Sequence, residues 1–301
     1  MYRARIDVES SASPAPILVL GATGTIGRYV VNQLRTCGAF VRAAARNPDR
    51  LTGMWSEGVE AVAFDFGEPS TWSAAFAGVD TAYLMRPPHI SNIARDMEPA
   101  LEAMETAGVK HVVLLSVLGA EDMPWVPHAK IEAWLRSSSM SWTFIRPSFF
   151  MENLSGVHAP AIADRREIIV PAGKGKTSFV AASDIAAVTA AVLLSPHEHR
   201  NRAWAPTGAE ALSYYAVAAI LSEAIGHRID YRRPGIPAYA VHAQRDLGMP
   251  WPMVATTIGI YTIARLGRAG GLTDDVQAVT GREPITMREW AIKHRDVWVP
   301  G

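Results

Sequence analysis

The sequence holds one cysteine, Cys37, in 301 residues, so no disulfide can form within the chain. Cys37 lies in a stretch of helical periodicity, where we expect a small buried thiol and not a redox or metal-binding group. An excess of one charge is equally lacking, because 29 acidic residues balance 29 basic ones. The chain therefore has no global electrostatic attraction for nucleic acid or for an anionic membrane.

Long apolar runs are also absent, since none approaches the roughly 20 residues that a membrane-spanning helix requires. Residues 1–15 are polar and lack the apolar segment of a secretory signal. We therefore expect a soluble, cytoplasmic protein without membrane contact. Serine and proline are frequent in residues 1–14, which we expect to form a flexible tail.

Short apolar runs do occur, and in the first half of the chain they alternate with segments of helical periodicity. A continuous apolar run that ends at a turn residue suits a strand buried on both faces of a parallel sheet. The expected strands cover residues 17–20, 40–45, 59–64, 81–85, 111–116 and 142–145. The expected helices cover residues 26–37, 48–54, 70–76 (with Ser70 as the N-cap), 93–107 and 129–136. This alternation predicts an α/β fold with a doubly wound parallel sheet of the Rossmann type.

The second half of the chain is less regular. We expect extended pieces at residues 167–170, 178–181 and 227–232, helices at 184–194 and 212–225, and mostly helix from residue 237 onward. Gly173–Thr177 superficially resembles a P-loop, but the earlier glycine of that motif is missing, which favours a hairpin loop. His197 and His199 lack a completing ligand cluster, so we expect no metal site.

These patterns predict a Rossmann domain and a smaller, mostly helical lobe. We expect the Rossmann domain to comprise residues 15–155 plus about 178–200. A substrate-binding lobe is expected to comprise residues 156–177 plus 201–301.

A glycine-rich turn follows the first expected strand and opens the first helix. It contains Gly21, Thr23, Gly24, Thr25, Ile26 and Gly27, with the glycines in the pattern G-x-x-G-x-x-G. Gly21 permits the tight turn, Gly24 lets a pyrophosphate approach the backbone, and Gly27 lets the helix pack on the strand. Free N–H groups at a helix N-terminus bind phosphates. A merely structural turn is the alternative, but the strand–turn–helix context predicts a dinucleotide site.

The end of the second strand indicates which dinucleotide binds. NAD sites place an acidic residue there to accept a hydrogen bond from the ribose 2′-hydroxyl. Residues 40–46 contain no acid and end in Arg46, with Arg50 one helical turn beyond. Guanidinium groups suit a 2′-phosphate, although both could be ordinary surface charges. We therefore predict NADP(H) as the cofactor.

Together these segments resemble the NmrA-like branch of the atypical short-chain dehydrogenase/reductases. The resemblance is carried by ILVLGATGTIGRYVV, VRAAARNPDRL, VEAVAFDF, HVVLLS, HAKIEAWLRSSSMSWTFIRPSFFMEN and SFVAASDIAAVTAAVLL. Festuclavine dehydrogenase-like proteins and the quinone and triphenylmethane reductases of this branch look most similar. The resemblance runs from about Ile17 to Leu194, with weaker echoes beyond.

The resemblance implies roles for residues at the ends of four strands. Near the third strand, Asp65, with Phe66 beside it, corresponds to the adenine contact. Leu84, Met85 and Arg86 correspond to the segment beside the ribose and pyrophosphate, and Pro87 follows at the substrate pocket. Ser116 corresponds to the end of strand five, as a candidate catalytic residue. The loop over the nicotinamide corresponds to residues 147–153, which supply Pro147 to the cofactor and Phe149, Phe150 and Asn153 to the pocket.

One departure from the family is conspicuous. Short-chain dehydrogenases use Tyr-x-x-x-Lys, in which the tyrosine is the acid/base and the lysine lowers its pKa and holds the ribose. Lys130 matches the lysine, but Val126 stands four residues earlier and cannot carry a proton. His128 has a suitable intrinsic pKa, but helical spacing points it away from Lys130, which favours a surface or supporting role. A hydrogen-bond donor to substrate and an ordinary strand-end serine are equally open for Ser116.

Three functions remain open at this point. The leading hypothesis is an NADPH-dependent reductase whose flat, apolar substrate needs no strong acid at the accepting atom, such as an iminium, a quinone or a conjugated carbonyl. The second is a non-catalytic NADP(H) sensor that reports redox state, and the missing tyrosine keeps it open. A sugar epimerase would need that same tyrosine. Aromatic residues suited to a flat ligand are Trp125, Phe149, Phe150, Tyr239 and Trp251. The sequence leaves a homodimer open and names no other partner than a small-molecule substrate.

Overall fold

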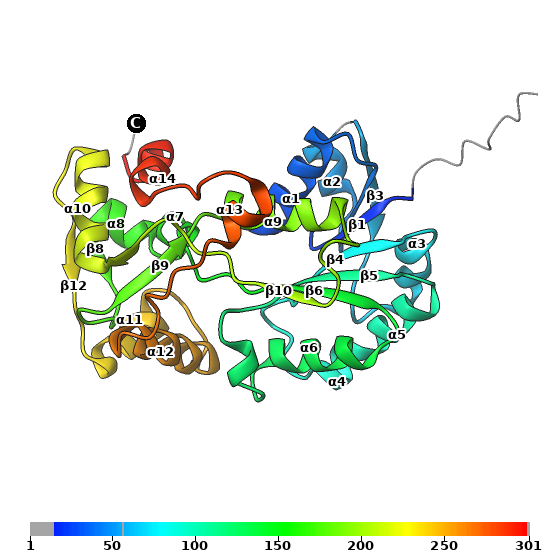
Figure 1. Cartoon of the computed structure of the whole chain (residues 1–301). Helices are drawn as coiled ribbons and strands as arrows, with labels where there is room; N and C mark the ends of the chain where they lie inside the picture. The colour runs from blue at the N-terminus through cyan, green and yellow to red at the C-terminus, as the bar shows by residue number, and fades with distance from the viewer. Residues whose placement is uncertain (1–14, 56, 300–301) are drawn as a thin grey trace, which may run out of the picture.

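A parallel sheet of seven strands organises the computed structural model, which describes residues 15–55 and 57–299. Its strands lie in the order β10-β6-β5-β4-β1-β2-β3 (Figure 1). They comprise β1 (Ile17–Leu20), β2 (Val41–Ala45), β3 (Val59–Ala63), β4 (Thr81–Met85), β5 (His111–Leu115), β6 (Ser141–Ile145) and β10 (Arg202–Trp204). The strand order reverses between β1 and β4, as in a doubly wound Rossmann sheet, so the predicted fold class is confirmed. The tail expected at residues 1–14 lies outside the described residues.

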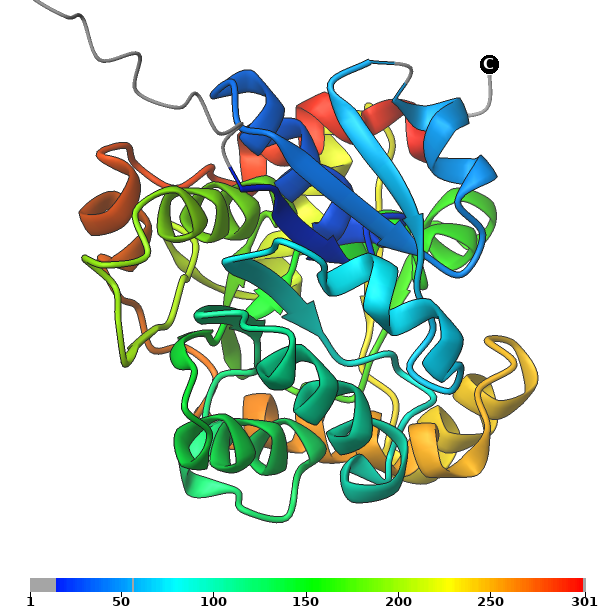
Figure 2. The same cartoon turned by 90° about the vertical axis from the view of Figure 1, so that its right-hand side faces the viewer.

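Helices cover both faces of this sheet (Figure 2). One face packs against α1 (Thr25–Thr36), α2 (Asp49–Met54), α9 (Ala182–Leu194) and α13 (Asp275–Thr280). The other packs against α3 (Trp72–Phe76), α4 (Ile93–Asp96), α5 (Glu98–Thr106) and α6 (Pro127–Ser137). Side chains alternate between the two faces along each strand, so in β4 Leu84 belongs to the α6 face and Tyr83 to the α1 face. This alternation decides where the residues that follow β4 point.

The rest of the chain forms a C-terminal lobe around a third core (Figure 1, left). A three-stranded sheet joins β11 (Ala211–Ser213), β9 (Lys176–Val180) and β7 (Phe149–Phe150), and a two-stranded sheet joins β12 (Asp230–Arg232) to β8 (Glu167–Ile169). The helices are α7 (Glu152–Ser155), α8 (Ala159–Arg165), α10 (Tyr214–Ile225), α11 (Ile236–Arg245), α12 (Trp251–Arg265) and α14 (Met287–His294). Short 3₁₀ turns are η1 (Pro69–Thr71), η2 (Ala120–Asp122) and η3 (Arg295–Val297). Among the described residues, no helix is long and apolar enough to span a membrane.

The expected domain boundaries need correction at three elements. β10 pairs with β6 and so belongs to the Rossmann sheet, although residues 201–301 were assigned to the lobe. Val276 of α13 is buried in the same core as α1 and α9. Conversely, β9 pairs with β7 and β11 in the lobe. The chain therefore crosses between the two parts more often than its composition indicates.

Several local expectations are also wrong. The hairpin expected around Gly173–Thr177 does not form, because β8 pairs with β12 and β9 pairs with β7 and β11. Ser70 does not cap a helix; it lies in η1, where its hydroxyl donates to Glu68. The helix expected over residues 93–107 is broken at Met97, between α4 and α5.

Cys37 is exposed, contrary to the buried thiol expected from its helical context. It stands at the C-cap of α1, just beyond the buried stripe of that helix. The buried stripe of α1 therefore ends before Cys37, and the thiol stays exposed.

Two carboxylates, the half-buried Glu152 and the buried Asp184, join the Rossmann sheet to the C-terminal lobe. Glu152 accepts hydrogen bonds from the backbone N–H of Ala182, at the start of α9, at 2.9 Å, and from the Trp290 indole at 3.0 Å. Asp184 of α9 accepts from the backbone N–H of Ile285 at 2.7 Å. Burial raises the pKa of both carboxyl groups. Because these bonds bind α9 to segments of the lobe, they hold the two sides of the candidate site in place.

Candidate functional site

The glycine-rich turn after β1 has the geometry that close approach of a ligand requires. Gly21 has a φ of 66°, a left-handed conformation that glycine adopts without strain. A Cβ added at Gly21 would lie 2.9 Å from the side chain of Met85, which packs over the turn from the end of β4. A Cβ added at Gly27 would overlap the carbonyl oxygen of Gly21. The turn is therefore tight because both positions lack side chains.

The N-terminus of α1 leaves its backbone donors free for an anion. Gly24 is the N-cap with φ −75° and ψ 168°, and it offers no side chain that could accept from the first turn. The N–H groups of the first helical residues, Thr25, Ile26 and Gly27, cannot bond within the helix. No acidic residue lies in this first turn. A cradle of unpaired N–H groups at a helix N-terminus fits the pyrophosphate of a dinucleotide, with Thr23 half-buried beside it.

The ends of β2 and β3 form the neighbouring part of the edge. Arg46 and Arg50 are exposed, and neither forms an ion pair within the described residues. The backbone N–H of Phe64 donates to the carbonyl of Ala45 at 3.0 Å, which places the segment after β3 beside Arg46. Two unpaired guanidinium groups at this edge are available to a 2′-phosphate.

Asp65 is held by its own turn. Its carboxylate accepts from the backbone N–H of Gly67 at 2.9 Å, and its carbonyl accepts from the Trp72 indole at 2.8 Å. Phe66 differs from the expectation of a cofactor contact, because its side chain is buried in the core against Phe64, with ring centroids 4.9 Å apart. Only Asp65 of this pair keeps a half-exposed side chain at the edge.

Arg86 follows β4 on the opposite side of the strand from Met85. Its Nη1 donates to the carbonyl oxygens of Pro87 at 3.0 Å, Pro88 at 3.1 Å and Ile90 at 2.6 Å. These bonds close the loop after β4 around the guanidinium. Leu84, which was expected beside the ribose, has its side chain fully buried in the core on the α6 face of the sheet.

Ser116 lies at the end of β5 but is not free to donate to a substrate. Its hydroxyl donates to Glu132 at 2.6 Å, and the residue is 2% exposed. Glu132, on α6, also accepts from Arg146 at 2.9 and 2.6 Å and from Arg136 at 3.0 Å. Burial alone would raise the pKa of Glu132, but the hydrogen bonds of Arg146 and Ser116 hold it below its ordinary value. Because its one hydroxyl proton is already donated to Glu132, the structure favours an ordinary strand-end serine over a hydrogen-bond donor to substrate.

The face of α6 that looks toward the site carries His128 and not Lys130. His128 shares its face with Ile131 and Glu132, which are buried against the sheet. Lys130 is exposed and lines a surface groove between α4 and α6, together with Asn92 and Trp134. The two residues do lie on different faces, as expected. However, His128 lies on the face that packs toward the sheet, and Lys130 lies on the outer face. The structure therefore places Lys130 in this groove, and its expected role at the ribose and nicotinamide stays a prediction.

His128 is an uncharged imidazole at neutral pH. Its pKa is lowered to about 4, first because burial disfavours the imidazolium and then because the Arg86 charge lies near it. The charge of Glu132 acts in the opposite direction and is outweighed. Val126 forms the N-cap of α6, and Pro124 stands four residues before His128. Neither position supplies a proton, so the part of α6 that replaces Tyr-x-x-x-Lys has no strong acid.

The loop after β6 brings two aromatic rings to the boundary with the C-terminal lobe. Pro147 is buried, and Phe149 and Phe150 of β7 are half-buried. The Phe149 ring lies 6.4 Å from that of Phe179 and 6.3 Å from that of Tyr261. Asn153 is exposed on α7. Phe149 and Phe150 are therefore the aromatic residues that best fit the expected pocket wall.

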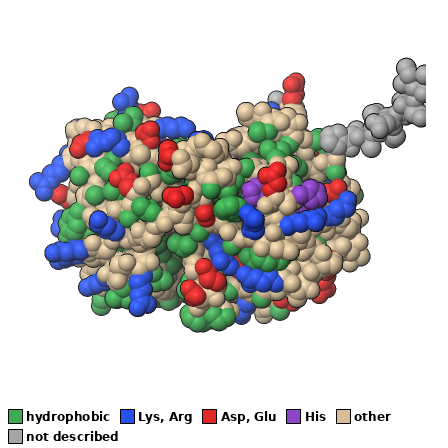
Figure 3. Space-filling model, in the orientation of Figure 1, with side chains coloured by type: hydrophobic (Ala, Val, Ile, Leu, Met, Phe, Trp, Pro, Cys, Tyr) green, Lys and Arg blue, Asp and Glu red, His purple; other side chains and the backbone are tan. Residues whose placement is uncertain are grey.

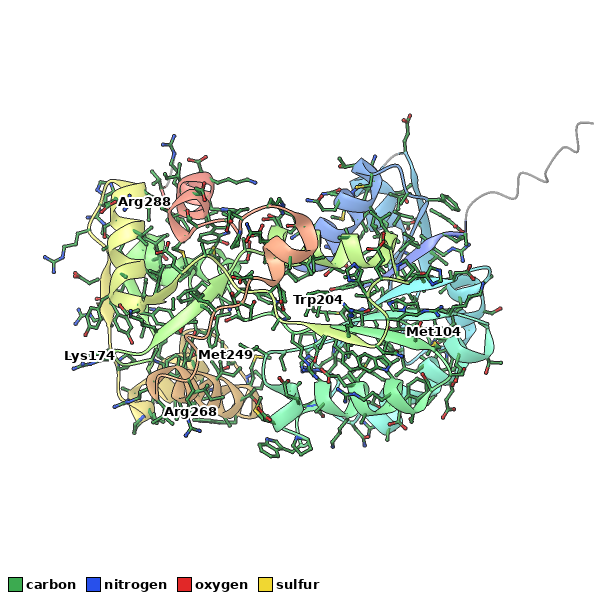
Figure 4. All side chains as sticks on the ribbon, viewed as in Figure 1. Met104, Lys174, Trp204, Met249, Arg268 and Arg288 are labelled. Carbon is green, nitrogen blue, oxygen red and sulfur yellow. The ribbon has the colours of Figure 1, made fainter. Side chains whose placement is uncertain are left out.

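The other aromatic residues expected in the pocket divide into two groups. Tyr239 is fully buried in the lobe core, whereas Trp125 and Trp251 are 70% and 61% exposed. A furrow separates the two parts of the molecule in space-filling view (Figure 3). Figure 4 shows Trp204 between them, whereas Lys174, Arg268 and Arg288 lie on the lobe away from the sheet.

Sequence patterns missed the network around Glu132. A carboxylate at Glu132 and a guanidinium at Arg136 stand four residues apart on one helix, which is a visible signal for an ion pair. The partnership with Arg146 and Ser116 joins three elements and has no local signal. Sequence spacing alone could not reveal that the Ser116 hydroxyl donates to Glu132.

Comparison with known proteins gives consistent matches over most of the chain. A model of the NmrA-like family matches residues 14–274. An NAD(P)H azoreductase of Xenophilus azovorans is 37% identical over 286 residues, which cover 92% of this chain and 97% of that protein. Quinone oxidoreductase 2 of Escherichia coli is 28% identical over 282 residues, which cover 91% and 96%. The solved structure of Citrobacter sp. triphenylmethane reductase complexed with NADP(H) has a TM-score of 0.79 at 25% identity, covering 92% of this chain and 99% of that chain.

Proposed function

Because the chain belongs to the NmrA-like family, with residues 14–274 matched, we propose that it is an NADPH-dependent reductase of a flat, apolar, conjugated acceptor. Its similarity to NAD(P)H-dependent azo, quinone and triphenylmethane reductases supports the class of oxidoreductase. The acceptor is of the iminium, quinone or conjugated carbonyl type. These are acceptors whose reduction needs no strong acid at the accepting atom.

The residues at the sheet edge fit NADP(H). The N–H groups at the start of α1 hold the pyrophosphate, Arg46 and Arg50 bind the 2′-phosphate, and Asp65 borders the adenine. When bound, the cofactor supplies a hydride, and the protein supplies orientation and electrostatics. Arg86, which follows β4, and His128, which lies in the first turn of α6, border the nicotinamide half. The Ser116–Glu132–Arg146 network holds the end of β5 against α6.

One observation carries the proposal of an acid-free reduction. Of the residues on α6 that could replace the missing tyrosine, the one that faces the site is His128, and its pKa of about 4 leaves it neutral at physiological pH. A positioned general acid works best when its pKa lies near the operating pH. The site is therefore suited to acceptors that take a hydride first and a proton from water afterwards.

Oxidation of NADPH in the presence of small acceptors tests this function. The panel contains a neutral quinone, an azo compound, a cyclic imine and a cationic triphenylmethane dye, each followed at the NADPH absorbance band. We expect rapid turnover with at least one of them and a tighter dissociation constant for NADPH than for NADH. Binding of NADPH without oxidation by any acceptor would contradict the reductase and favour a redox sensor, for which the missing tyrosine is the supporting observation.

A further inference from the structure

Arg86 lies on the nicotinamide side of the sheet edge. Residues of β4 alternate, so Leu84 packs on the α6 face and Met85 on the α1 face, beside the glycine-rich turn. Arg86 follows on the α6 face, where its charge lowers the pKa of His128. In a doubly wound sheet the two halves of a dinucleotide lie on either side of the switch point, which here falls between β1 and β4. Arg86 therefore faces away from the pyrophosphate turn and toward the place of the reacting groups.

The guanidinium of Arg86 is only partly used by the protein. All the hydrogen bonds that its side chain makes among the described residues come from Nη1, which donates to the carbonyls of Pro87, Pro88 and Ile90. Nε is buried and has no partner among the described residues, so a ligand does not reach it. Nη2 makes no hydrogen bond in this part of the chain either, but it is not buried, so a ligand can reach it.

No anion of the described chain neutralises Arg86. No carboxylate forms an ion pair with it among residues 15–55 and 57–299. Glu132, the nearest acid on α6, is already bound by Arg146, Arg136 and Ser116. His128 beside it is neutral, and burial of the guanidinium lowers the pKa of Arg86 without discharging it. A half-buried, uncompensated guanidinium is unfavourable unless a ligand supplies the negative charge.

We propose that Nη2 of Arg86 binds the acceptor atom on which negative charge collects during reduction, so that neutral acceptors are preferred over cationic ones. This inference rests on the proposed reductase function and names its substrate class. A quinone that takes a hydride, one proton with two electrons, from NADPH becomes a hydroquinone monoanion and leaves NADP⁺. The anion then takes a proton from water. Arg86 stabilises the oxyanion, whereas a cationic iminium or dye loses its charge on reduction and gains nothing from a guanidinium.

The variant Arg86→Gln tests the proposal with two acceptors of similar size, a neutral naphthoquinone and a cationic triphenylmethane dye. We expect kcat/KM for the quinone to fall by about 10²-fold, the loss typical of one oxyanion donor. The rate with the dye should stay unchanged or rise. The dissociation constant for NADPH should change by no more than about twofold, which is a smaller free-energy change than the ~1.4 kcal/mol of a tenfold change. Arg86→Lys keeps the positive charge on a side chain of different shape and should recover part of the quinone rate. Equal losses with both acceptors would mean that Arg86 only supports its loop and would overturn the proposal.

A binding measurement separates this inference from the reductase function. 2-Naphthoate is a flat aromatic anion, and 2-naphthylmethylammonium is its matched cation. In the presence of NADP⁺, calorimetry should show that the anion binds to the wild type. Its binding to Arg86→Gln should be at least about tenfold weaker, as expected for the loss of one charged contact. The affinity for the cation should not fall in this way. If wild type and variant bind naphthoate equally, or neither binds it, Arg86 is not an anion site. If naphthoate binding depends on Arg86 but no acceptor oxidises NADPH, the anion site stands and the reductase function fails.

Discussion

The two halves of the sheet edge are built from different kinds of groups. One half lies at the ends of β1, β2 and β3, and the other lies at the ends of β4 and β5 and the start of α6. The first, which we call the adenine half, offers backbone N–H groups and exposed guanidinium groups around Gly24 and Arg46. The second, the nicotinamide half, depends on side chains that hold one another, with Glu132 at their centre. The backbone site requires glycine, because a Cβ would block the approach of the ligand. The side-chain site depends instead on which hydrogen-bond partner each polar group has in the folded structure.

Removing the charge of Glu132 should have the largest effect, and it should fall on the stability of the nicotinamide half. Glu132→Gln removes the buried counter-charge of Arg146 and leaves it only the exposed carboxylate of Glu121, and we expect a loss of about 3–5 kcal/mol in the free energy of unfolding. The matched control is Glu121→Gln, because Glu121 contacts the same guanidinium at 2.9 Å but is 46% exposed, whereas Glu132 is 1% exposed. We expect the control to cost at most about 1 kcal/mol. Urea unfolding followed by circular dichroism measures both, and similar losses would contradict the central place of Glu132.

The stability that Glu132 contributes should also depend on pH. Hydrogen bonds and charges of its partners keep the pKa of Glu132 below its ordinary value, against the effect of burial. A carboxylate whose pKa is depressed by folding stabilises the native state above its unfolded pKa and loses that contribution as the pH falls through its folded pKa. Wild type and Glu132→Gln should therefore converge in stability toward acid pH. A gap that widens in acid would contradict the assigned direction.

The next prediction concerns the adenine half. Gly24→Val places a branched side chain before the N–H groups of α1, and we expect NADPH affinity to fall by at least about two orders of magnitude, or ~2.7 kcal/mol. Gly53→Val on α2 is the control, since nothing lies within 4 Å of a Cβ added there. Calorimetric titration and circular dichroism together separate loss of binding from loss of fold. Retained affinity in a folded Gly24→Val would show that the turn serves only the structure.

A smaller effect is expected at Arg46. Arg46→Ala removes a charge-assisted contact to the 2′-phosphate, which is worth about 1.5–3 kcal/mol. NADPH binding should weaken roughly tenfold or more while NADH binding hardly changes. Arg268→Ala, on the C-terminal lobe in Figure 4, should change neither dissociation constant. Equal losses for both cofactors would remove the basis for preferring NADP(H).

The smallest effect should follow from Lys130→Ala. Lys130 points into the groove against α4, so we expect the NADPH dissociation constant and the hydride rate to stay within about twofold, well under the ~1.4 kcal/mol of a tenfold change. Competitive titration and single-turnover kinetics measure the two quantities. A tenfold loss of affinity would place the Lys130 ammonium back at the ribose, where the family pattern would have it.

The contrast between the two halves also explains how far the sequence could be interpreted. Gly21, Gly24 and Gly27 are recognisable because their role depends on the backbone and on fixed spacing. The doubly wound parallel sheet follows from the alternation of strand and helix patterns. His128 and Lys130 differ by two positions on one helix, and only packing decides which of them faces inward. Ser116 could not be interpreted correctly, because its partner Glu132 comes from another element. The pairing of β10 with β6 and of β8 with β12 is likewise long-range and has no local signal.

Single-turnover oxidation of NADPH by a neutral quinone, measured from pH ~6 to ~8.5, tests most directly whether the hydride step proceeds without an acid from the protein. His128 has a pKa of about 4 and stays neutral throughout this window, and Arg86 stays charged. The account predicts a rate that is constant within about twofold, far less than the 10²–10⁴-fold that a positioned acid contributes. A rate that falls steeply above pH ~6.5, the ordinary imidazole value, and that loses this dependence in His128→Ala would contradict it and identify His128 as the acid.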